Sequence, residues 1–436
     1  MDILLSIVYI IALLFIIKKW SFFQNSGIRF QSISAIFLIK ILFSFLLYFI
    51  YDQFYGYQSD SYYFFNDAQI IYKELKNNTA DLFSIITSIG YSDFEHESIL
   101  RETSFWYKKY DYGLYNDNRT LIRLNLIFSI ISHGSYHIHS IFMCFITLIG
   151  FVGIYRAFCS YLQQIKNLLF FAVFLAPSVL FWGSGIFKEG ILIFALGLLF
   201  FSLQKIYSNN YSLKSIIILF FTIGILLVTK IYFLLGLIPF LILFFLFRNS
   251  NKHLIIKILG IHIVCVSIAF SLKYIDNSLD IPQYFVMKQG DFINVANEQT
   301  SKNFIDFQKL ENNLGAFILA SPKAILNTTF KPFLWESNNS LAILSSIENV
   351  LLLLIPLALI FYTRKINSTQ KFWIYGLLSF VMLLFIIIGL TVPISGAIVR
   401  YKMPLIPFIL VLFLLLMDQN KIRELNWVNK IINLKI

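Results

Sequence analysis

The sequence predicts an all-α, polytopic membrane helix bundle, and its composition supports this fold class in three ways. Of the 436 residues, 58% are hydrophobic, only 13% are charged, and Phe alone contributes 48. A soluble chain of this length could not shield so large an apolar surface, since exposed apolar area costs roughly 25 cal/mol per Å². The same composition excludes a disordered chain, a disulfide scaffold and a coiled coil.

A helix needs about 20 mostly apolar residues to cross the hydrocarbon layer of a membrane, and about eleven stretches meet this requirement. These stretches are residues 2–17, 33–51, 138–155, 167–186, 189–204, 215–229, 231–247, 256–272, 341–362, 372–394 and 403–417. A further apolar stretch, residues 121–133, is shorter and carries Arg123. Because such short segments are more often interfacial or re-entrant, we expect it not to span. Residues 1–436 then form a single transmembrane domain.

The basic residues predict the orientation of the chain, since Lys and Arg accumulate in cytoplasmic loops near the ends of spans. If the N-terminus lies outside and residues 121–133 do not cross, the inside holds 17 basic residues and two acidic ones. If residues 121–133 did cross, 14 of those 17 would move outside. The sequence therefore predicts an outer N-terminus and an inner C-terminus. This topology accounts for the net charge of +12, so we expect no nucleic acid as a partner.

The same topology leaves two large hydrophilic loops on the outer face, residues 52–120 and 273–340. Residues 62–75 carry apolar side chains at helical spacing, so we expect interfacial helices along the membrane surface in the first loop. This loop also holds 11 of the 23 acidic residues of the chain. Several of these acids are expected to form a solvated face, namely Asp93, Glu95, Glu97, Asp111 and Asp117.

Four cations fall at the predicted outer ends of spans, where Lys and Arg are normally scarce. They are Lys188, Lys230, Arg400 and Lys402. An ionisable side chain near a span is costly and suggests a functional site. For any one of them, snorkelling of the long side chain to the lipid headgroups is the simpler explanation. As a group they predict binding of an anion, such as the phosphate of a lipid carrier.

One run in the membrane portion, residues 176–189, combines helix-breaking residues with charges. Pro177, Gly183 and Gly185 loosen the end of a span, and Lys188-Glu189 turns the chain into the next span. Irregular backbone at that depth is tolerated only where it is buried or lines a cavity. We therefore count Glu189 with the four cations as a candidate substrate-binding residue. A plain hairpin with its charges among the headgroups remains the alternative.

The first loop supplies a candidate base, Asp60, close to the second predicted span. A carboxylate near a cationic cavity can take a proton from a sugar hydroxyl or hold a divalent metal ion. Asp60 is the candidate catalytic residue, and Asp67 is a further candidate for substrate binding. An N-cap role for Asp60, in a helix starting near Tyr62, is compatible with catalysis.

Three histidines, His133, His137 and His139, have a spacing that invites a metal site. The intervening Gly134-Ser135 argues against a continuous helix, and no carboxylate partner accompanies them. We therefore expect polar turn residues here. A divalent cation is left open as the only candidate cofactor.

The run Ser59-Asp60-Ser61-Tyr62-Tyr63, with Ala68 following, resembles the acidic motif of the C-type (GT-C) glycosyltransferases. These are polytopic enzymes that use polyprenyl-phosphate-linked sugars. Residues 177–189 and 398–404 resemble stretches of uncharacterised bacterial membrane proteins linked to surface polysaccharide synthesis. The chain departs from the motif because no Asp-Glu pair stands at Asp60, which leaves the metal open.

The resemblance implies a glycosyltransferase of the bacterial inner (cytoplasmic) membrane. Asp60 would activate the acceptor, while Lys188, Lys230 and Arg400 would hold the donor phosphate. The implied partners are a polyprenyl-phosphate-linked sugar, a glycan or lipid-linked acceptor, and membrane lipids. No nucleotide-binding motif is present, and an activated lipid-linked donor would need none.

Three other classes of protein fit part of this pattern. A polysaccharide polymerase or ligase of another membrane fold would share the substrates and the cations. A lipid-linked oligosaccharide flippase would place charges in the middle of spans, where Lys40 is the main candidate. A non-enzymatic membrane component of a secretion complex would need none of these residues.

Overall fold

The chain was examined as a computed structural model, which describes most of its residues. The described residues are 2–56, 59–107, 115–250, 252–298, 304–305, 309–337, 340–363, 366 and 368–436. Asp111, which the sequence assigns to a solvated face, lies outside the described residues.

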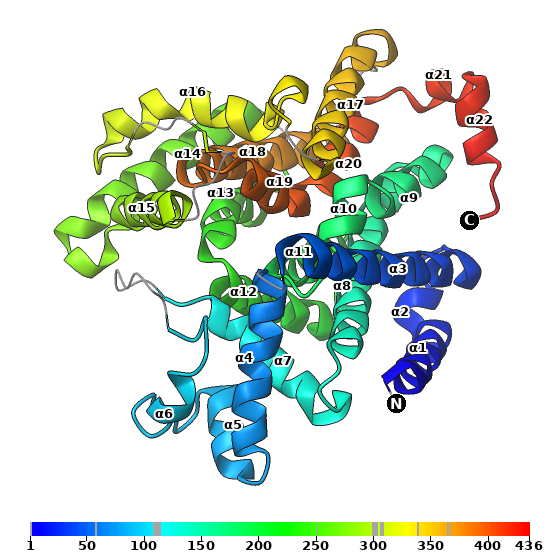
Figure 1. Ribbon diagram of the computed structural model, residues 1–436. Helices are drawn as coiled ribbons and strands as arrows, with labels where there is room; N and C mark the ends of the chain where they lie inside the picture. The colour runs from blue at the N-terminus through cyan, green and yellow to red at the C-terminus, as the bar shows by residue number, and fades with distance from the viewer. Residues whose placement is uncertain are drawn as a thin grey trace. The chain divides into compact units, whose positions relative to one another are not determined.

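The described residues form helices, with two isolated antiparallel bridges, so the predicted all-α class is confirmed (Figure 1). The helices of the N-terminal part are α1 (Asp2–Lys19), α2 (Ser21–Gln24), α3 (Phe30–Tyr55), α4 (Asp60–Leu75), α5 (Thr79–Thr87), α6 (Glu97–Leu100), α7 (Asn118–Ser132) and α8 (Tyr136–Phe158). The next are α9 (Lys166–Phe174), α10 (Pro177–Trp182), α11 (Lys188–Tyr207), α12 (Leu213–Thr229), α13 (Ile231–Phe247), α14 (Leu254–Ser271), α15 (Ile281–Glu298) and α16 (Leu314–Phe330). The last are α17 (Ser340–Tyr362), α18 (Ser368–Thr391), α19 (Ser395–Lys402), α20 (Ile406–Leu416), α21 (Gln419–Arg423) and α22 (Asn426–Ile432).

Seven helical segments in the described part of the chain are long and apolar enough to cross a membrane, which indicates a multi-pass membrane protein. They are Phe30–Phe54, Tyr136–Tyr161, Lys188–Tyr207, Leu254–Tyr274, Leu341–Tyr362, Gln370–Thr391 and Ser395–Leu416. Two further apolar helices, Leu213–Thr229 and Ile231–Phe247, are shorter. Seven of the about eleven predicted spans thus coincide with helical segments of membrane length. Helix α1 coincides with the first predicted span but also carries Asp2, Lys18 and Lys19.

The predicted span 167–186 is not one helix. It is split into α9, which ends at Phe174, and the six-residue α10, which starts at Pro177. Proline lacks a backbone N–H and disfavours a helical residue before it, so the helix cannot run through this point. The backbone from Gly183 to Phe187, between α10 and α11, is non-helical and buried.

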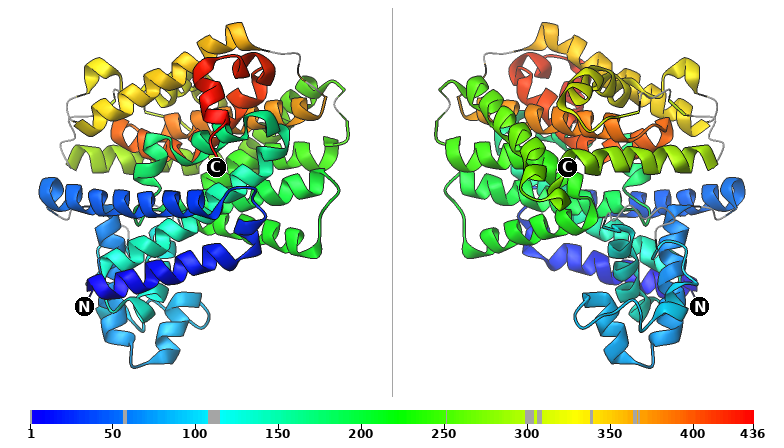
Figure 2. Two further views of the ribbon diagram at one scale, coloured as in Figure 1. Left: turned by 90° about the vertical axis from the view of Figure 1, so that its right-hand side faces the viewer. Right: turned by 90° about the vertical axis from the view of Figure 1, so that its left-hand side faces the viewer.

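The chain forms two compact units. The first unit comprises residues 1–157, 179–230 and 435–436, and the second comprises residues 158–178 and 231–434. In the first unit, α1 runs beside α3 (Figure 2). Helices α4, α5, α6 and α7 pack together with a buried apolar core that includes Trp106.

Two glycines allow α8 and α11 of the first unit to approach each other closely. A Cβ atom built on Gly197 would lie 1.9 Å from the carbonyl oxygen of Gly150, and one on Gly150 would lie 2.4 Å from that of Ile193. Small residues permit such backbone contact between membrane helices. This contact fixes α11, and therefore the position of Lys188 at its start.

In the second unit, α18 is the central helix. It packs against α13, α14, α15, α16 and α20. Gly389 of α18 faces the backbone of α16, where a Cβ atom would lie 2.2 Å from the carbonyl oxygen of Ala324. The predicted second loop therefore contains two long helices, α15 and α16, which pack on the membrane-length helix α18.

Candidate functional site

Asp60 is the first residue of α4, and Ser59 is the N-cap of that helix. The Oγ atom of Ser59 accepts a hydrogen bond from the backbone N–H of Tyr62. Asp60 therefore does not occupy the N-cap position that the sequence offered as an alternative. Residues i, i+4, i+7 and i+8 share one helix face, so Asp60 starts the face that carries the buried Phe64, Asp67 and Ala68.

Lys188 reaches the same face of α4. Its Nζ atom lies 5.6 Å from the centre of the Phe64 ring, one helical turn beyond Asp60. The same atom donates to Oδ1 of Asn118 at 2.6 Å and lies 2.9 Å from Oδ1 of Asp117. The side chains of Lys188 and Asp117 are only 10% and 17% exposed, so this ion pair is largely removed from water.

Glu189 and Lys230 form a second ion pair in the same unit. The Nζ atom of Lys230, at the end of α12, donates to Oε1 of Glu189, in the first turn of α11, at 2.8 Å. The two side chains are 3% and 2% exposed. Lys188, Glu189 and Lys230 thus lie where α11 begins and α12 ends, and Lys188 reaches Phe64 of α4.

Lys40 explains how the irregular backbone after α10 is tolerated. Its Nζ atom donates to the carbonyl oxygen of Gly183 at 2.6 Å and approaches Oγ of Ser184 at 3.4 Å. The carbonyl groups of a broken helix need such partners inside a membrane. The Lys40 ammonium, in the middle of α3, therefore has backbone partners. This contact accounts for the charge without the lipid-flippase hypothesis.

Asp67 connects α4 to a later segment of the first loop. Its two carboxylate oxygens accept hydrogen bonds from the backbone N–H groups of Ser104 and Phe105, at 2.8 and 2.7 Å. Burial raises the pKa of Asp67 above its usual value, and the two N–H donors partly oppose this rise. These contacts link α4 to the segment around Trp106.

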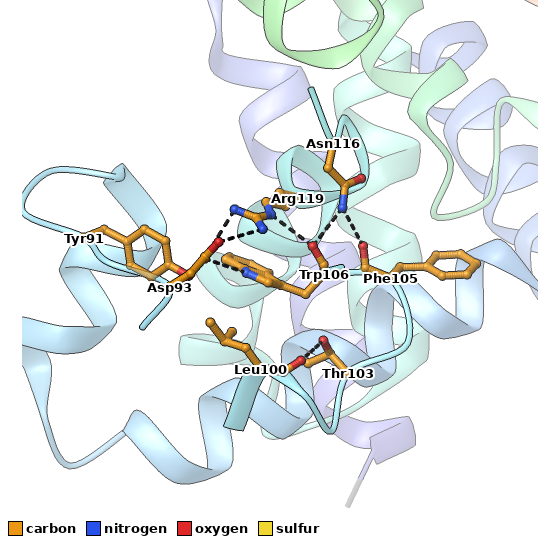
Figure 3. Close-up of polar contacts among 8 residues, drawn as sticks. All are labelled: Tyr91, Asp93, Leu100, Thr103, Phe105, Trp106, Asn116 and Arg119. Carbon is orange, nitrogen blue, oxygen red and sulfur yellow. Dashed lines mark hydrogen bonds and ion pairs between the residues drawn. The ribbon is translucent and has the colours of Figure 1, made fainter. Parts of the chain in front are cut away.

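A second set of contacts, centred on Asp93 and Arg119, also holds the segment around Trp106 (Figure 3). The carboxylate of Asp93 accepts hydrogen bonds from the Tyr91 hydroxyl, from Nε1 of Trp106 and from the guanidinium of Arg119. Arg119 also donates to the carbonyl oxygen of Trp106, as does Asn116. The prediction of a solvated Asp117 is wrong, because its side chain is only 17% exposed and pairs with Lys188. Asp93 keeps 38% of its side chain exposed and also pairs with a cation, Arg119.

Burial alone would raise the pKa of Asp93. The hydrogen bonds from Tyr91, Trp106 and Arg119, together with the positive charge of Arg119, outweigh burial and hold this pKa below its usual value. The ionised carboxylate is thus the form that fits the cluster. In contrast, Glu95 is exposed, as predicted for a solvated face.

The three histidines predicted as turn residues lie in different kinds of local structure. His133 ends α7 in a left-handed conformation, and α8 starts at Tyr136, so the predicted break at Gly134-Ser135 is confirmed. His137 and His139, however, lie on α8 and are not turn residues.

His139 is completely buried in a polar network. Its Nε2 atom is 2.7 Å from Oγ of Ser132, and its Nδ1 atom is 2.7 Å from Oδ1 of Asn125. This order resembles the nucleophile, base and orienting group of a hydrolase. All three side chains are 0% exposed, and the rings of Phe65 and Phe128 pack on the imidazole. The network therefore joins α7 to α8 and is closed to substrates.

The remaining two candidates, Arg400 and Lys402, belong to α19 in the second unit. The Nζ atom of Lys402 donates to Oδ1 of Asn349 at 2.7 Å and to the carbonyl oxygen of Thr328 at 3.1 Å. Lys402 is 3% exposed, so its ammonium group holds α16 and α17 together. The Arg400 guanidinium lies 5.3 Å from the centre of the Tyr401 ring, and its side chain is half-buried.

Glu348, in the same unit, was not singled out as a site residue. Its carboxylate accepts hydrogen bonds from the backbone N–H and the hydroxyl of Ser178, at 3.0 and 2.8 Å. The Glu348 carboxylate therefore accepts from the first turn of α10, which begins at Pro177. The proline in the sequence marks this break, but nothing in the sequence identifies the partner.

No group of three or more His, Cys, Asp or Glu side chains lies as metal ligands would among the residues that the structure describes. The structure therefore gives no ligand set to assign to a divalent cation in that part of the chain. No family model, no curated protein and no solved structure matches the chain.

Proposed function

We propose that this chain is a membrane glycosyltransferase of the C type. It would transfer a sugar from a polyprenyl-phosphate-linked donor to a glycan or lipid-linked acceptor on the outer face of the bacterial cytoplasmic membrane. One observation carries the proposal: the Lys188 ammonium lies over Phe64, one helical turn from Asp60 on the same face of α4. A carboxylate and a cation then stand on one surface, next to helices of membrane length.

The charges that develop during sugar transfer give Asp60 and Lys188 separate roles. The bond between the sugar C1 atom and the phosphate oxygen breaks, and its electron pair leaves with the phosphate. The acceptor oxygen forms the new bond to C1, while Asp60 takes the proton of the acceptor hydroxyl. Lys188 stabilises the negative charge that grows on the departing phosphate, and such stabilisation is strongest in a partly dehydrated site.

In this proposal, the ion pair of Glu189 and Lys230 does not contact the substrate and serves to position Lys188. It holds the start of α11 against the end of α12, so that Lys188 points toward α4. Asp117 and Asn118 support the Lys188 ammonium in the absence of substrate. An incoming phosphate replaces the carboxylate of Asp117 at this ammonium.

The proposed topology keeps the N-terminus outside and the C-terminus inside, with the shorter and broken helices completing about eleven crossings. Contacts within the first unit support it, because residues predicted outside meet one another. Lys188 contacts Asp117, and the Thr120 hydroxyl donates to the carbonyl oxygen of Val228 at 2.6 Å. Residues predicted inside also meet, since the Arg156 guanidinium donates to the carbonyl oxygen of Phe22 at 2.8 Å.

The test is donor turnover by the purified protein in proteoliposomes. Polyprenyl-phosphate-linked hexoses and pentoses are supplied with a crude glycan acceptor, and released polyprenyl phosphate is measured. We expect Asp60→Asn to lower turnover at least 100-fold, in line with loss of a general base. Glu74→Gln, an exposed acid on the same helix, should keep native turnover. Release by Asp60→Asn at the native rate, or no release from any donor by the native protein, overturns the proposal.

A second candidate is a non-enzymatic membrane component of a secretion complex. It is favoured by the pairing of Lys188 with Asp117 and of Lys230 with Glu189, because ion pairs of this kind also serve stability alone. In that case, Asp60→Asn leaves glycan assembly in cells unchanged at normal protein abundance.

A further inference from the structure

Helix α16 of the second unit belongs to the predicted second outer loop, yet it packs along α18, a helix of membrane length. A Cβ atom on Gly389 of α18 would touch the carbonyl oxygen of Ala324. One turn further along α16, the hydroxyl of Thr328 donates to the carbonyl oxygen of Phe385 at 2.9 Å. The two helices are therefore antiparallel. Phe385 lies six residues, or about 9 Å, before the end of α18 at Thr391, so α16 extends inward past the predicted outer end of α18.

The last residues of α16 meet the middle of α17, a second helix of membrane length. The Nδ2 atom of Asn349 donates to the carbonyl oxygens of Phe330 and Lys331, at 3.2 and 3.0 Å. Asn349 lies nine residues after the start of α17 at Ser340 and 13 residues before its end at Tyr362. At 1.5 Å per residue, these separations are about 14 and 20 Å. Helix α16 therefore ends well within the length of a helix that can cross the membrane.

The end of α16 has protein partners for its carbonyl groups, as a helix end in a water-poor environment requires. The Lys402 ammonium donates to the carbonyl oxygen of Thr328 at 3.1 Å, while the Asn349 amide serves the carbonyl groups at the end of the helix. Asn349 and Lys402 are 4% and 3% exposed. A cation at this position is also favoured by the helix dipole. At the other end of α16, the N-cap residue Asn313 is exposed.

The face of α16 opposite α18 is apolar and exposed within the described part of the chain. Ile318, Leu319 and Leu326 are 61%, 82% and 55% exposed. Such a surface is costly in water, whereas lipid acyl chains have the same apolar character. Lys323, also exposed, stands at the edge of this face and next to Ala324, which contacts α18 near its predicted outer end. From there, the long lysine side chain can reach the lipid headgroups.

We propose that α16 is a re-entrant helix. It enters the membrane from the outer side, ends beside the middle of α17, and presents Leu326 to the acyl chains of the outer leaflet. The following segment carries no net charge into this region, because the Lys331 ammonium pairs with the Glu336 carboxylate at 2.6 Å. Residues 273–340 are then partly within the membrane. The number of crossings is unchanged, because the chain returns to the side from which it entered. The inference concerns topology and does not rest on glycosyltransferase activity.

Spin labels on single cysteines test this inference with the full chain in vesicles of phosphatidylethanolamine and phosphatidylglycerol. The native cysteines are replaced by alanine, and labels are attached in Leu319→Cys and Leu326→Cys. The control is Glu311→Cys, since Glu311 is exposed and precedes α16. Accessibility to oxygen, which concentrates in hydrocarbon, is compared with accessibility to a water-soluble nickel chelate. We expect residue 326 to favour oxygen and residue 311 to favour nickel. Residue 326 should lie deeper than residue 319 by up to about 10 Å, the length of helix between them.

Two results would overturn the inference. Nickel accessibility at residue 326 equal to that at residue 311 would place α16 in water. Exclusion of both reagents from residue 326 would show that protein, rather than lipid, covers this face.

A photoreactive benzophenone side chain in place of Leu326 gives a second measurement in the chain with its native cysteines, which guards against misfolding of the alanine background. We expect crosslinks to phospholipid acyl chains, identified by the mass of the adduct. Crosslinks to protein alone, or no lipid adduct, contradict the inference. Asp60→Asn should give the same adducts as the native chain, so failed turnover and failed membrane insertion of α16 remain distinguishable.

Discussion

The ammonium of Lys230 lies 2.8 Å from the carboxylate of Glu189, and neither side chain is more than 3% exposed. The two residues stand at the end of α12 and in the first turn of α11, so one ion pair ties two helices that are successive in the chain. Inside a membrane domain each charge would be costly alone, because the low dielectric leaves it without solvation. Each charge in the pair therefore depends on the other to offset the cost of its burial.

We predict that removing one member of this pair destabilises the protein more than removing both. Lys230→Met leaves the Glu189 carboxylate buried without its cation and should cost about 3–5 kcal/mol. The double variant Lys230→Met, Glu189→Leu removes both charges and should recover most of this loss. Thermal unfolding in detergent measures the three proteins. Additive effects of the two substitutions would show that the groups do not depend on each other.

The glycine contact between α8 and α11 gives a second prediction. Gly197→Ala places a Cβ atom 1.9 Å from the carbonyl oxygen of Gly150, so the helices must separate, at a cost of about 1–3 kcal/mol or more. Gly224→Ala is the matched control, because a Cβ atom on Gly224 of α12 meets nothing within 4 Å. It should be neutral or stabilising by up to about 1 kcal/mol. In one detergent, Gly197→Ala should therefore lower the unfolding temperature, while Gly224→Ala should leave it unchanged or raise it. Equal shifts in the two variants would contradict the close contact between α8 and α11.

The cluster around Asp93 predicts how the first loop responds to acid. The pKa of Asp93 is lower in the folded protein than its usual value of 3.8, so its contribution to stability is complete above that value. It is lost as the pH falls through the folded pKa. Hydrogen exchange of the Trp106 indole N–H, which donates to Asp93, should therefore show protection from pH 7 down to about 4 and lose it below that range, after correction for intrinsic rates.

Two variants isolate this effect. Asp93→Asn should lower the protection of the Trp106 indole N–H at all pH values, because the neutral amide is a weaker acceptor and cannot form the ion pair with Arg119. Glu95→Gln changes an exposed acid two residues away and should behave like the native protein. Loss of protection in the native protein already near pH 6 would mean that another group controls the loop.

Sequence periodicity and apolar length predicted the membrane-length helices, because they depend on local composition. The helix α4 and the break at Gly134-Ser135 were also predictable, since capping and turn residues act over a few positions. The partners of the charges were not predictable. Asp93 was expected in solvent, yet Arg119 binds it from 26 residues away. Which acid meets which cation depends on packing between distant segments, and a single sequence gives no measure of that.

The same limit applies to the candidate site. The sequence selected Lys188 and Asp60, and in the structure Lys188 lies over Phe64, four residues after Asp60 on the same helix. It did not select Asp117, whose carboxylate pairs with the Lys188 ammonium. Lysines within apolar stretches were conspicuous in the sequence, whereas Lys40 and Lys402 serve as donors to backbone carbonyl groups. For Lys40 and Lys402, a charged residue in a predicted span therefore indicates a buried hydrogen bond within the protein and not a bound ligand.

The pairing of Lys188 with Asp117 gives the final prediction, which follows from the proposed function. A phosphate that binds Lys188 must compete with the carboxylate of Asp117, which lies 2.9 Å from the ammonium. Asp117→Asn removes the competing charge, while Asn118 still accepts a hydrogen bond from Lys188 at 2.6 Å and keeps it in place. Affinity for polyprenyl phosphate should therefore rise about tenfold in Asp117→Asn, a change of about 1.4 kcal/mol, and fall by a similar factor in Lys188→Gln. Asp81, a partly exposed acid on α5, provides the control Asp81→Asn, which should leave affinity unchanged. If Asp117→Asn instead weakens binding, the carboxylate assists the lysine rather than competing with the phosphate, and Lys188 is not the anion site.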